Sequence, residues 1–266
     1  MRLLELCCGE NHSWSKAGRA LGFQCTTLDW ESKCQADLRM DVRHFWPEGN
    51  GHFDIVCASP DCAELSQARR AHGCKEGDES FADSVGQACV SIIQHYVTRG
   101  GIGLLENPEQ ALPKRPWMRN YDHLGRVVDY CMWSSPRPAD FDGSRPCQQK
   151  LCDWFPARKP TALYMFGGPT KWLPSRARCR RLKGDCGFCD ENGAHISWSR
   201  HCQDRKQIEV CRARGFPHVF STAELHRIPS ALCRELLQHA AASPARGLGE
   251  KERDAGVPRM QGDAAA

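Results

Sequence analysis

The sequence contains no apolar run long enough to cross a bilayer, and neither sign of charge is in large excess. A membrane-spanning helix needs about 20 apolar residues in succession, so we expect no such helix. The net charge is only +4, so bulk charge does not identify a nucleic-acid partner, and local clusters have to be considered instead. The first residues, Met1 to Leu6, are too short and too acidic for a signal peptide. We therefore expect a soluble, intracellular protein, with the nucleus and other host-cell compartments left open.

A disulfide-stapled scaffold is also not expected, although the chain has 17 cysteines. Such scaffolds are usually short secreted domains, and this chain is neither short nor preceded by a secretion signal. Its cysteines are scattered through apolar segments, where cysteine acts as a small buried side chain. A few are left as candidates for a nucleophile or for metal ligands.

The apolar pattern alternates between short runs and segments with helical spacing. It predicts strands over residues 2–8, 23–28, 37–42, 53–58, 102–106 and 161–166, and helices over 13–22, 81–98 and 228–241. Ser13 is a plausible N-cap of the first helix. Alternating strands and helices predict an α/β fold with a mostly parallel, Rossmann-like sheet and right-handed crossovers.

The pattern changes after about residue 135, and no internal repeat is visible. We predict a core over residues 1–166, a small, irregular, basic Cys/His-bearing insert over 167–220, and a closing helix that returns to the core over 221–241. Residues 242–266 are small and polar, which is typical of a disordered tail.

Polar clusters follow five of the predicted strands. In parallel α/β sheets, ligands bind beyond the carboxyl ends of the strands, so these clusters are candidate site residues. They are Cys7-Cys8-Gly9, Asp29, Asp41, Ser59-Pro60-Asp61-Cys62 and Glu106-Asn107-Pro108.

The first three clusters suit a nucleoside-bearing ligand. Gly9 lets the backbone approach a ligand closely, and the following helix directs amide groups towards that place. Asp29 suits ribose hydroxyls, Trp30 an adenine face, and Asp41 with Val42 the adenine amino group. The alternative is a generic nucleotide fold. A dinucleotide fingerprint is absent, because no further glycines follow Gly9.

In this order the motifs resemble those of the cytosine-5 methyltransferases, especially the short phage and large-virus members. The resemblance covers residues 2–166, with a weaker match over 225–240. The matching motifs are Leu6-Cys-Cys-Gly9 with Ser13, Asp29-Trp30, Asp41-Val42, Ser59-Pro-Asp-Cys62, Leu105-Glu-Asn-Pro108, Arg158-Lys-Pro-Thr161 and Ile228-Pro-Ser-Ala-Leu232.

The resemblance implies a Rossmann-like S-adenosylmethionine-dependent DNA (cytosine-5)-methyltransferase. Cys62 would be the nucleophile that attacks cytosine carbon 6, and Glu106 the acid at ring nitrogen 3. Asn107 would hold the loop, Ser59 and Pro60 would shape the cytosine pocket, and Lys159 would belong to the basic motif. The implied cofactor-binding residues are Leu6, Cys7, Cys8, Gly9, Ser13, Asp29, Trp30, Asp41, Val42, Ser59 and Pro60.

The sequence departs from the family pattern beside the nucleophile. Asp61 stands where the family has Pro, and Ala63 where it has Gln. A carboxylate next to a thiol disfavours the thiolate. One alternative is therefore a catalytically silent, nucleic-acid-binding relative in which Cys62 is structural. RNA or single-stranded DNA as substrate, and another acceptor altogether, are also left open.

A basic cluster lies in the predicted insert and is a candidate nucleic-acid-binding surface. Lysine and arginine grouped in this way neutralise phosphates, and Trp172 and Trp198, which flank the cluster, could stack on unpaired bases. The alternative is a solvated loop. The cluster consists of Arg176, Arg178, Arg180, Arg181 and Lys183.

The same segment has the spacing of a zinc knuckle in Cys186-Gly-Phe-Cys189. A tetrahedral site needs two more ligands, for which Cys179, Cys202, His195 and His201 are candidates. We predict structural zinc at Cys179, Cys186, Cys189 and Cys202, with free thiols as the alternative. The pattern does not give the oligomeric state.

Overall fold

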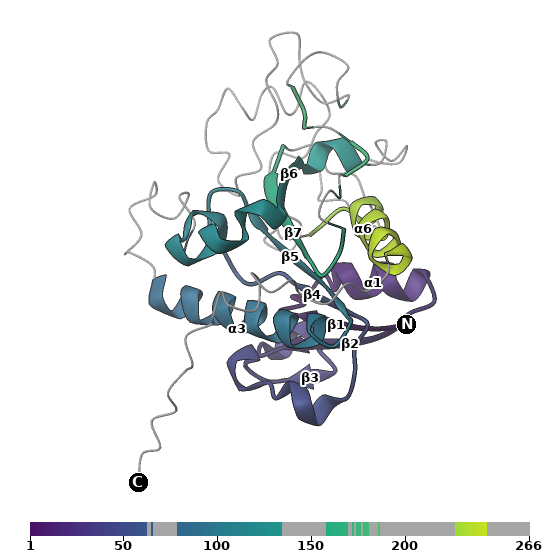
Figure 1. Ribbon diagram of the computed structural model, residues 1–266, viewed down its shortest axis with the longest axis vertical. Coiled ribbons are helices and arrows are strands. Elements are labelled where there is room, and N and C mark those ends of the chain that lie inside the picture. The colour runs from purple at the N-terminus through teal and green to yellow at the C-terminus, as the bar shows by residue number, and fades with distance from the viewer. Residues whose placement is uncertain are drawn as a thin grey trace.

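The computed structural model describes residues 1–62, 65, 79–134, 158–169, 172, 174–176, 178–180, 186 and 227–243, and the structural statements below concern these residues. A central twisted sheet carries helices on both faces, as Figure 1 shows. The predicted α/β class is confirmed. No helix in the described part of the chain is both long and apolar enough to span a bilayer.

The sheet has seven strands in the order β3-β2-β1-β4-β5-β7-β6. The first five are parallel and follow the 3-2-1-4-5 order of a Rossmann sheet, whereas β7 runs antiparallel to both β5 and β6. The strands are β1 (Arg2–Leu6), β2 (Gln24–Asp29), β3 (Leu38–Arg39), β4 (Ile55–Ala58), β5 (Ile102–Pro108), β6 (Gly125–Asp129) and β7 (Pro160–Phe166).

Three α-helices in the described part of the chain cover the sheet. They are α1 (Ser13–Ala20), α3 (Glu79–Val97) and α6 (Ser230–Ala242). Helix α3 lies on one face, and α1 and α6 lie together on the other (Figure 1). The closing helix, far away in sequence, thus packs beside the first one.

Each face of the sheet has its own apolar core. Ile93 and Tyr96 of α3 are fully buried against one face, and Trp14 of α1 is fully buried with Leu236 of α6 against the other. Helix α3 approaches β5 so closely that a side chain at Gly103 would overlap Ile93. Glycine is required there because the two backbones pack at close range.

Short 3₁₀ segments also lie between the strands in the described part of the chain. They are η1 (Ser32–Cys34), η2 (Val42–His44), η3 (Pro47–Asn50), η5 (Leu112–Lys114), η6 (Pro116–Leu124) and η7 (Tyr130–Trp133). The second of these shortens the third predicted strand, because Asp41 accepts a hydrogen bond from the Arg43 amide and begins a turn.

The predicted strands and helices all occur, but the prediction differs from the structure at the far edge of the sheet. The strand predicted over 161–166 is β7, and it is antiparallel. Strand β6 was not predicted, because five residues with only two buried side chains give little periodicity. Pairing with β7 stabilises β6, and that contact is not visible in the local sequence.

The N-cap prediction at Ser13 is wrong. His12 occupies the N-cap in a left-handed conformation, and Ser13 is the first residue of the helix. The Ser13 hydroxyl instead accepts a hydrogen bond from the Ile228 amide at 3.2 Å. The helix needs no cap from its own N-cap side chain, because the carboxylate of Glu5 in β1 accepts hydrogen bonds from its first amides.

Candidate active site

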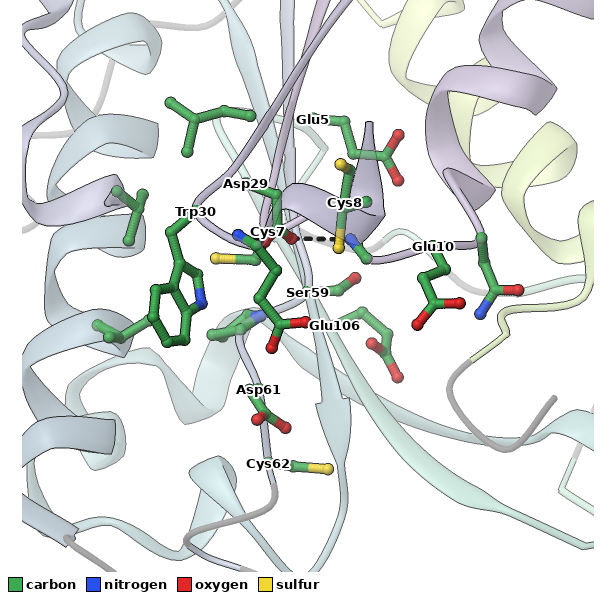
Figure 2. Close-up of a pocket in the computed structure, with 18 of the residues that line it drawn as sticks. Glu5, Cys7, Cys8, Glu10, Asp29, Trp30, Ser59, Asp61, Cys62 and Glu106 are labelled. Atoms are coloured by element: carbon green, nitrogen blue, oxygen red, sulfur yellow. Dashed lines mark hydrogen bonds between the residues drawn. The ribbon is translucent and has the colours of Figure 1, made fainter. Parts of the chain in front are cut away.

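A cavity of about 360 Å³ opens at the carboxyl ends of β1, β2, β4 and β5. All five polar clusters identified in the sequence contribute residues to its lining (Figure 2). The strand register explains this arrangement, because Leu6 pairs with both Leu28 and Ala58, and Ala58 with Leu105. The segments that follow these residues must therefore leave the sheet at the same edge.

The turn after β1 is wound tightly against β2. Cys7, Gly9 and His12 all have positive φ values, of 54°, 56° and 48°. The Gly9 amide donates to Asp29 Oδ2 at 3.0 Å, the bond dashed in Figure 2. Two non-glycine residues in the left-handed region store strain, which is common at binding sites.

The side chain of Glu5, in β1, caps the start of α1. The sequence analysis did not predict this role. Its buried carboxylate accepts hydrogen bonds from the amides of Trp14 at 3.1 Å and Ser15 at 2.9 Å. The prediction that these helix amides serve a ligand is therefore wrong for this pair, since a side chain already satisfies them. The only signal in the sequence was an acidic residue inside an apolar strand.

Burial dominates the electrostatics of Glu5. It raises the pKa of the carboxyl above its ordinary value, while the hydrogen bonds from Ser15 and Trp14 and the charge of His12 act in the opposite direction. Glu5 also lines the cavity. It therefore links the start of the helix to the wall of the ligand site.

Asp29 and Trp30 lie together at the end of β2. Asp29 is almost fully buried, and its second oxygen, Oδ1, accepts a hydrogen bond from the Glu31 amide at 3.0 Å. A carboxylate has about four acceptor positions, so further bonds to a ligand are possible. Trp30 lines the cavity with 64% of its surface exposed, which leaves its ring open to a flat ligand.

Asp41 lines the cavity but is already paired within the chain. Its carboxylate binds the Arg43 guanidinium, with Oδ2 lying 2.6 Å from a terminal nitrogen, and this pairing lowers the pKa of Asp41. Val42, also in the lining, is buried beside it. The predicted contact of Asp41 with an adenine amino group stays a prediction.

The loop that carries Cys62 is fixed from two sides. The Trp14 indole donates to the Ser59 hydroxyl at 3.0 Å, and the Asn107 amide donates to the Pro60 carbonyl at 2.8 Å. Asn107 in turn accepts from the Leu112 amide at 3.0 Å. The loop is thus tied both to α1 and to the end of β5.

Cys62 lies at the lower end of the labelled cavity side chains in Figure 2, below Asp61 and Glu106. Burial raises the pKa of its thiol to about 12, Lys159 lowers it, and the charges of Asp61 and Glu106 raise it. The thiol is therefore protonated at neutral pH in the ligand-free protein. A reaction through Cys62 requires Lys159 or a bound substrate to favour the thiolate.

Glu106 and Lys159 meet at a buried tyrosine. The Tyr130 hydroxyl donates to Glu106 Oε1 at 2.7 Å, and the Lys159 ammonium lies 5.0 Å from the centre of the Tyr130 ring. Glu106 and Lys159 are both buried and both line the cavity. Lys159 is there because β7 is antiparallel, which brings its start beside the end of β5.

The lining is strongly acidic. Among the described lining residues, positive charge comes from Lys33 and Lys159 alone. Seven carboxyl groups are present, from Glu5, Glu10, Asp29, Glu31, Asp41, Asp61 and Glu106. A cavity of this kind favours a ligand that carries positive charge or several hydroxyl and amino donors. Sequence reasoning did not single out Glu10, Glu31 or Lys33.

The basic cluster is only partly described, since Arg181, Lys183 and Trp198 lie outside the described residues. Arg178 pairs with Glu109 at 3.3 Å and with Asp129 at 3.5 Å. Arg176 donates to the Met132 carbonyl and lies over the Trp133 ring. These two arginines are thus engaged within the chain. Arg180 is exposed at the surface.

Stacking on Trp172 is excluded. Its ring is 4% exposed, and its indole donates to the Leu124 carbonyl at 3.2 Å. The residue anchors its segment to the sheet. An indole placed in this way is a core side chain, so the predicted role in base stacking is wrong for Trp172.

Three cysteines gather at a second place in the molecule. The sulfur atoms of Cys131, Cys179 and Cys186 all lie within 4.8 Å of one another. Cys179 and Cys186 belong to the predicted metal set, whereas Cys131 does not. Cys189 and Cys202 lie outside the described residues, as do His195 and His201.

No family model matches the sequence, and no curated protein matches it. One similar solved structure is that of a protein from Thermoplasma acidophilum, provisionally described as a methyltransferase. The two chains are 13% identical, and the match covers 62% of this chain and 66% of that one with a TM-score of 0.33. At this TM-score the similarity does not indicate a function. The residues that line the cavity are the basis for inferring one.

Proposed function

We propose that the protein is an S-adenosylmethionine-dependent methyltransferase that acts on carbon 5 of cytosine in DNA through a covalent adduct with Cys62. The observation that carries the proposal is that Cys62, Glu106 and Lys159 line the same cavity as the Gly9 turn. A methyl donor and a pyrimidine must meet at van der Waals distance to react. One cavity that holds both groups of residues meets that requirement.

The acidic lining supports a cationic methyl donor. S-adenosylmethionine carries a sulfonium and an ammonium group, which the carboxyl groups of the lining would attract, and a carboxylate, with which a lysine of the lining could pair. The volume of about 360 Å³ is within the range of small-molecule sites. Trp30, with its exposed ring in the lining, offers a surface for the adenine.

The residues around Cys62 support covalent catalysis. When bound, S-adenosylmethionine supplies a methyl group that is transferred from its sulfonium to cytosine carbon 5, leaving S-adenosylhomocysteine. The Cys62 thiolate adds to carbon 6, which makes carbon 5 nucleophilic. After carbon 5 has taken the methyl group and lost its proton to solvent, the carbon–sulfur bond breaks and the thiolate is released.

Glu106 and Lys159 supply the supporting charges in this proposal. The Glu106 carboxyl contacts ring nitrogen 3 and offsets the charge that develops there. The Tyr130 hydroxyl orients the Glu106 carboxyl through the bond at 2.7 Å. Lys159 lowers the pKa of the Cys62 thiol and so increases the fraction of thiolate.

DNA as the polymer rests on the motif resemblance and on the exposed Arg180. A cytosine in a duplex must be turned out of the helix to reach a cavity of this kind, whereas an unpaired cytosine is cheaper to extrude. Single-stranded DNA and RNA are therefore the substrates to test beside duplex DNA.

Transfer of labelled methyl from S-adenosylmethionine to duplex DNA, single-stranded DNA and RNA tests the proposal. We expect label in 5-methylcytosine for the wild type and at least about a thousandfold less for Cys62→Ala, because the covalent step is lost. Cys25→Ala is the matched control, since Cys25 is also half-buried but lies outside the cavity. Methyl transfer that survives Cys62→Ala would indicate a different acceptor.

A second candidate is a catalytically silent nucleic-acid-binding protein that retains the donor fold. The observation in its favour is the Cys62 pKa of about 12, which Asp61 helps to raise. DNA that contains 5-fluorocytosine separates the two candidates. An active enzyme is trapped as a covalent complex because the fluorine blocks release of the adduct, whereas a binding protein is not trapped.

A further inference from the structure

The three clustered cysteines come from separate parts of the chain. Cys131 lies in η7, directly after the edge strand β6, whereas Cys179 and Cys186 follow β7 at a distance. Cys131 and Cys179 are buried, and Cys186 is partly exposed. None of the three forms a disulfide. A common function would explain why residues so far apart in sequence converge here.

The distances between the sulfur atoms match a tetrahedral metal site. Cys179 Sγ and Cys186 Sγ are 3.7 Å apart, and all three sulfur atoms lie within 4.8 Å of one another. Zinc binds thiolate at about 2.3 Å, so two ligands of a regular tetrahedron are separated by about 3.8 Å. A disulfide would instead require about 2.0 Å.

The surroundings also suit a group of thiolates with a metal ion. The buried Asp129 carboxylate accepts a hydrogen bond from the Cys179 amide at 3.0 Å, which fixes the backbone of that ligand. Arg158 and Arg178 pair with the same carboxylate at 3.1 and 3.5 Å. The two guanidinium groups balance the charges of Asp129 and of Glu109, which also pairs with Arg178 at 3.3 Å, so Asp129 does not add an uncompensated negative charge beside a zinc–thiolate centre.

We propose that Cys131, Cys179 and Cys186 bind one structural zinc ion that fastens the segment after β7 to the edge of the sheet. The Cys186-Gly-Phe-Cys189 knuckle stays a prediction from the sequence, since Cys189 lies outside the described residues. Cys131 was absent from the set predicted by sequence. The centre is separate from the cavity, so the proposal does not depend on methyl transfer.

The position of the centre explains why this segment would need a metal. Around residue 175, most of the described contacts to the rest of the molecule are polar. Glu235 of α6 accepts a hydrogen bond from the Ser175 amide at 2.6 Å, Arg176 donates to the Met132 carbonyl, and Arg178 pairs with Glu109. A segment with so little apolar core benefits from a metal ion that links it to the core. Cys131 supplies the core side of that link.

Metal analysis of the full chain, purified without chelator and with zinc in the medium, tests the proposal. We expect about one zinc per chain in the wild type and at least about a tenfold lower content in Cys131→Ser. Cys233→Ser is the matched control, because Cys233 is equally buried but lies in α6, outside the cluster. It should keep its zinc. Absence of zinc from the wild type, or iron in its place, would overturn the proposal.

A measurement on the wild type guards against a Cys131 variant that fails to fold. Cysteine alkylation is followed by peptide mass spectrometry before and after treatment with a strong chelator. Cys131, Cys179 and Cys186 should resist alkylation with zinc bound and become at least about tenfold more reactive without it. Equal reactivity in both states, or a disulfide among the three, would contradict the proposal.

Discussion

The chemistry at Cys62 depends on three charged neighbours, one positive and two negative. Lys159 lowers the pKa of the thiol, and Asp61 and Glu106 raise it, while burial holds it at about 12. Asp61 is the one of these groups that departs from the motif that Cys62 otherwise resembles. A substitution at Asp61 should therefore change the fraction of Cys62 that is thiolate, and with it the reactivity of Cys62.

Replacement of Asp61 by Asn should make Cys62 more reactive. Removing the negative charge lowers the pKa of the thiol, so at a given pH alkylation should be about 3- to 10-fold faster, which corresponds to a pKa lower by about 0.5 to 1. In the wild type the rate should rise with pH up to about 12, because only the thiolate reacts. Iodoacetamide labelling of Cys62 between about pH 7 and about pH 10 measures both effects.

The control for this comparison is Asp122→Asn, which removes an exposed carboxylate from a segment that does not line the cavity. Its alkylation rate should equal that of the wild type. If Asp61→Asn leaves the rate unchanged or slows it, the carboxylate does not suppress the thiolate. The silent-binding alternative would then lose its main physical reason.

At the scale of the elements, two junctions determine the site. The antiparallel direction of β7 places Lys159 beside the end of β5. Glu5 in β1 accepts the first amides of α1, so the strand and the helix that follows it are joined by a buried side chain. Both junctions lie where the sheet meets the cavity. A substitution in either one should therefore change both the stability of the protein and the geometry of the cavity.

Replacement of Glu5 by Ala should destabilise the protein by about 2 kcal/mol, because two buried amides lose their acceptor. Urea denaturation followed by tryptophan fluorescence measures the change in the free energy of unfolding. Glu5→Gln is the conservative control and should cost less, since its carbonyl oxygen can still accept one bond. An unchanged midpoint for Glu5→Ala would contradict the capping role.

Glu5 also predicts a pH dependence of stability. Burial raises the pKa of the folded carboxyl above that of the unfolded chain. The stability from this group is therefore fully present below the unfolded pKa of about 4.3 and is lost as the pH rises through the folded pKa. Wild type should lose stability relative to Glu5→Gln over that interval. A constant difference between the two proteins would show that Glu5 does not titrate there.

At the scale of the whole molecule, the cavity collects residues from both ends of the described chain. Glu5 comes from β1 and Gly9 from the turn after it, Cys62 and Glu106 come from the middle, and Ile228 comes from the segment before α6. A ligand that binds these residues together must stabilise the folded protein, because the unfolded chain cannot hold them in place.

Addition of S-adenosylmethionine should therefore raise the melting temperature. At a ligand concentration of 100 times Kd the stabilisation is about 2.7 kcal/mol, and Trp30→Ala should reduce it through weaker binding. Trp46→Ala is the matched control, because Trp46 is 67% exposed and lies outside the lining. Differential scanning fluorimetry measures all three proteins. A donor that stabilises none of them, or an equal effect in both variants, would contradict the proposed donor site.

Much of the fold and of the cavity follows from local sequence. Apolar runs that end at Gly9, Asp29, Ser59 and Asn107 predict parallel strands, and the carboxyl ends of such strands share one edge. This was sufficient to predict that five distant clusters line one site. The same reasoning predicted neither β6 nor the role of Glu5, because both depend on partners that are remote in sequence.

The sequence by itself determined the α/β class, the order of the elements and the polar residues at the strand ends, because periodicity and turn chemistry are local properties of a chain. Only the tertiary structure decided that Glu5 takes the helix amides, that Trp172 is buried, and that Cys131 joins Cys179 and Cys186. Each of these depends on which surfaces meet when the sheet and helices pack. Packing is set by contacts between distant residues, which no local pattern records.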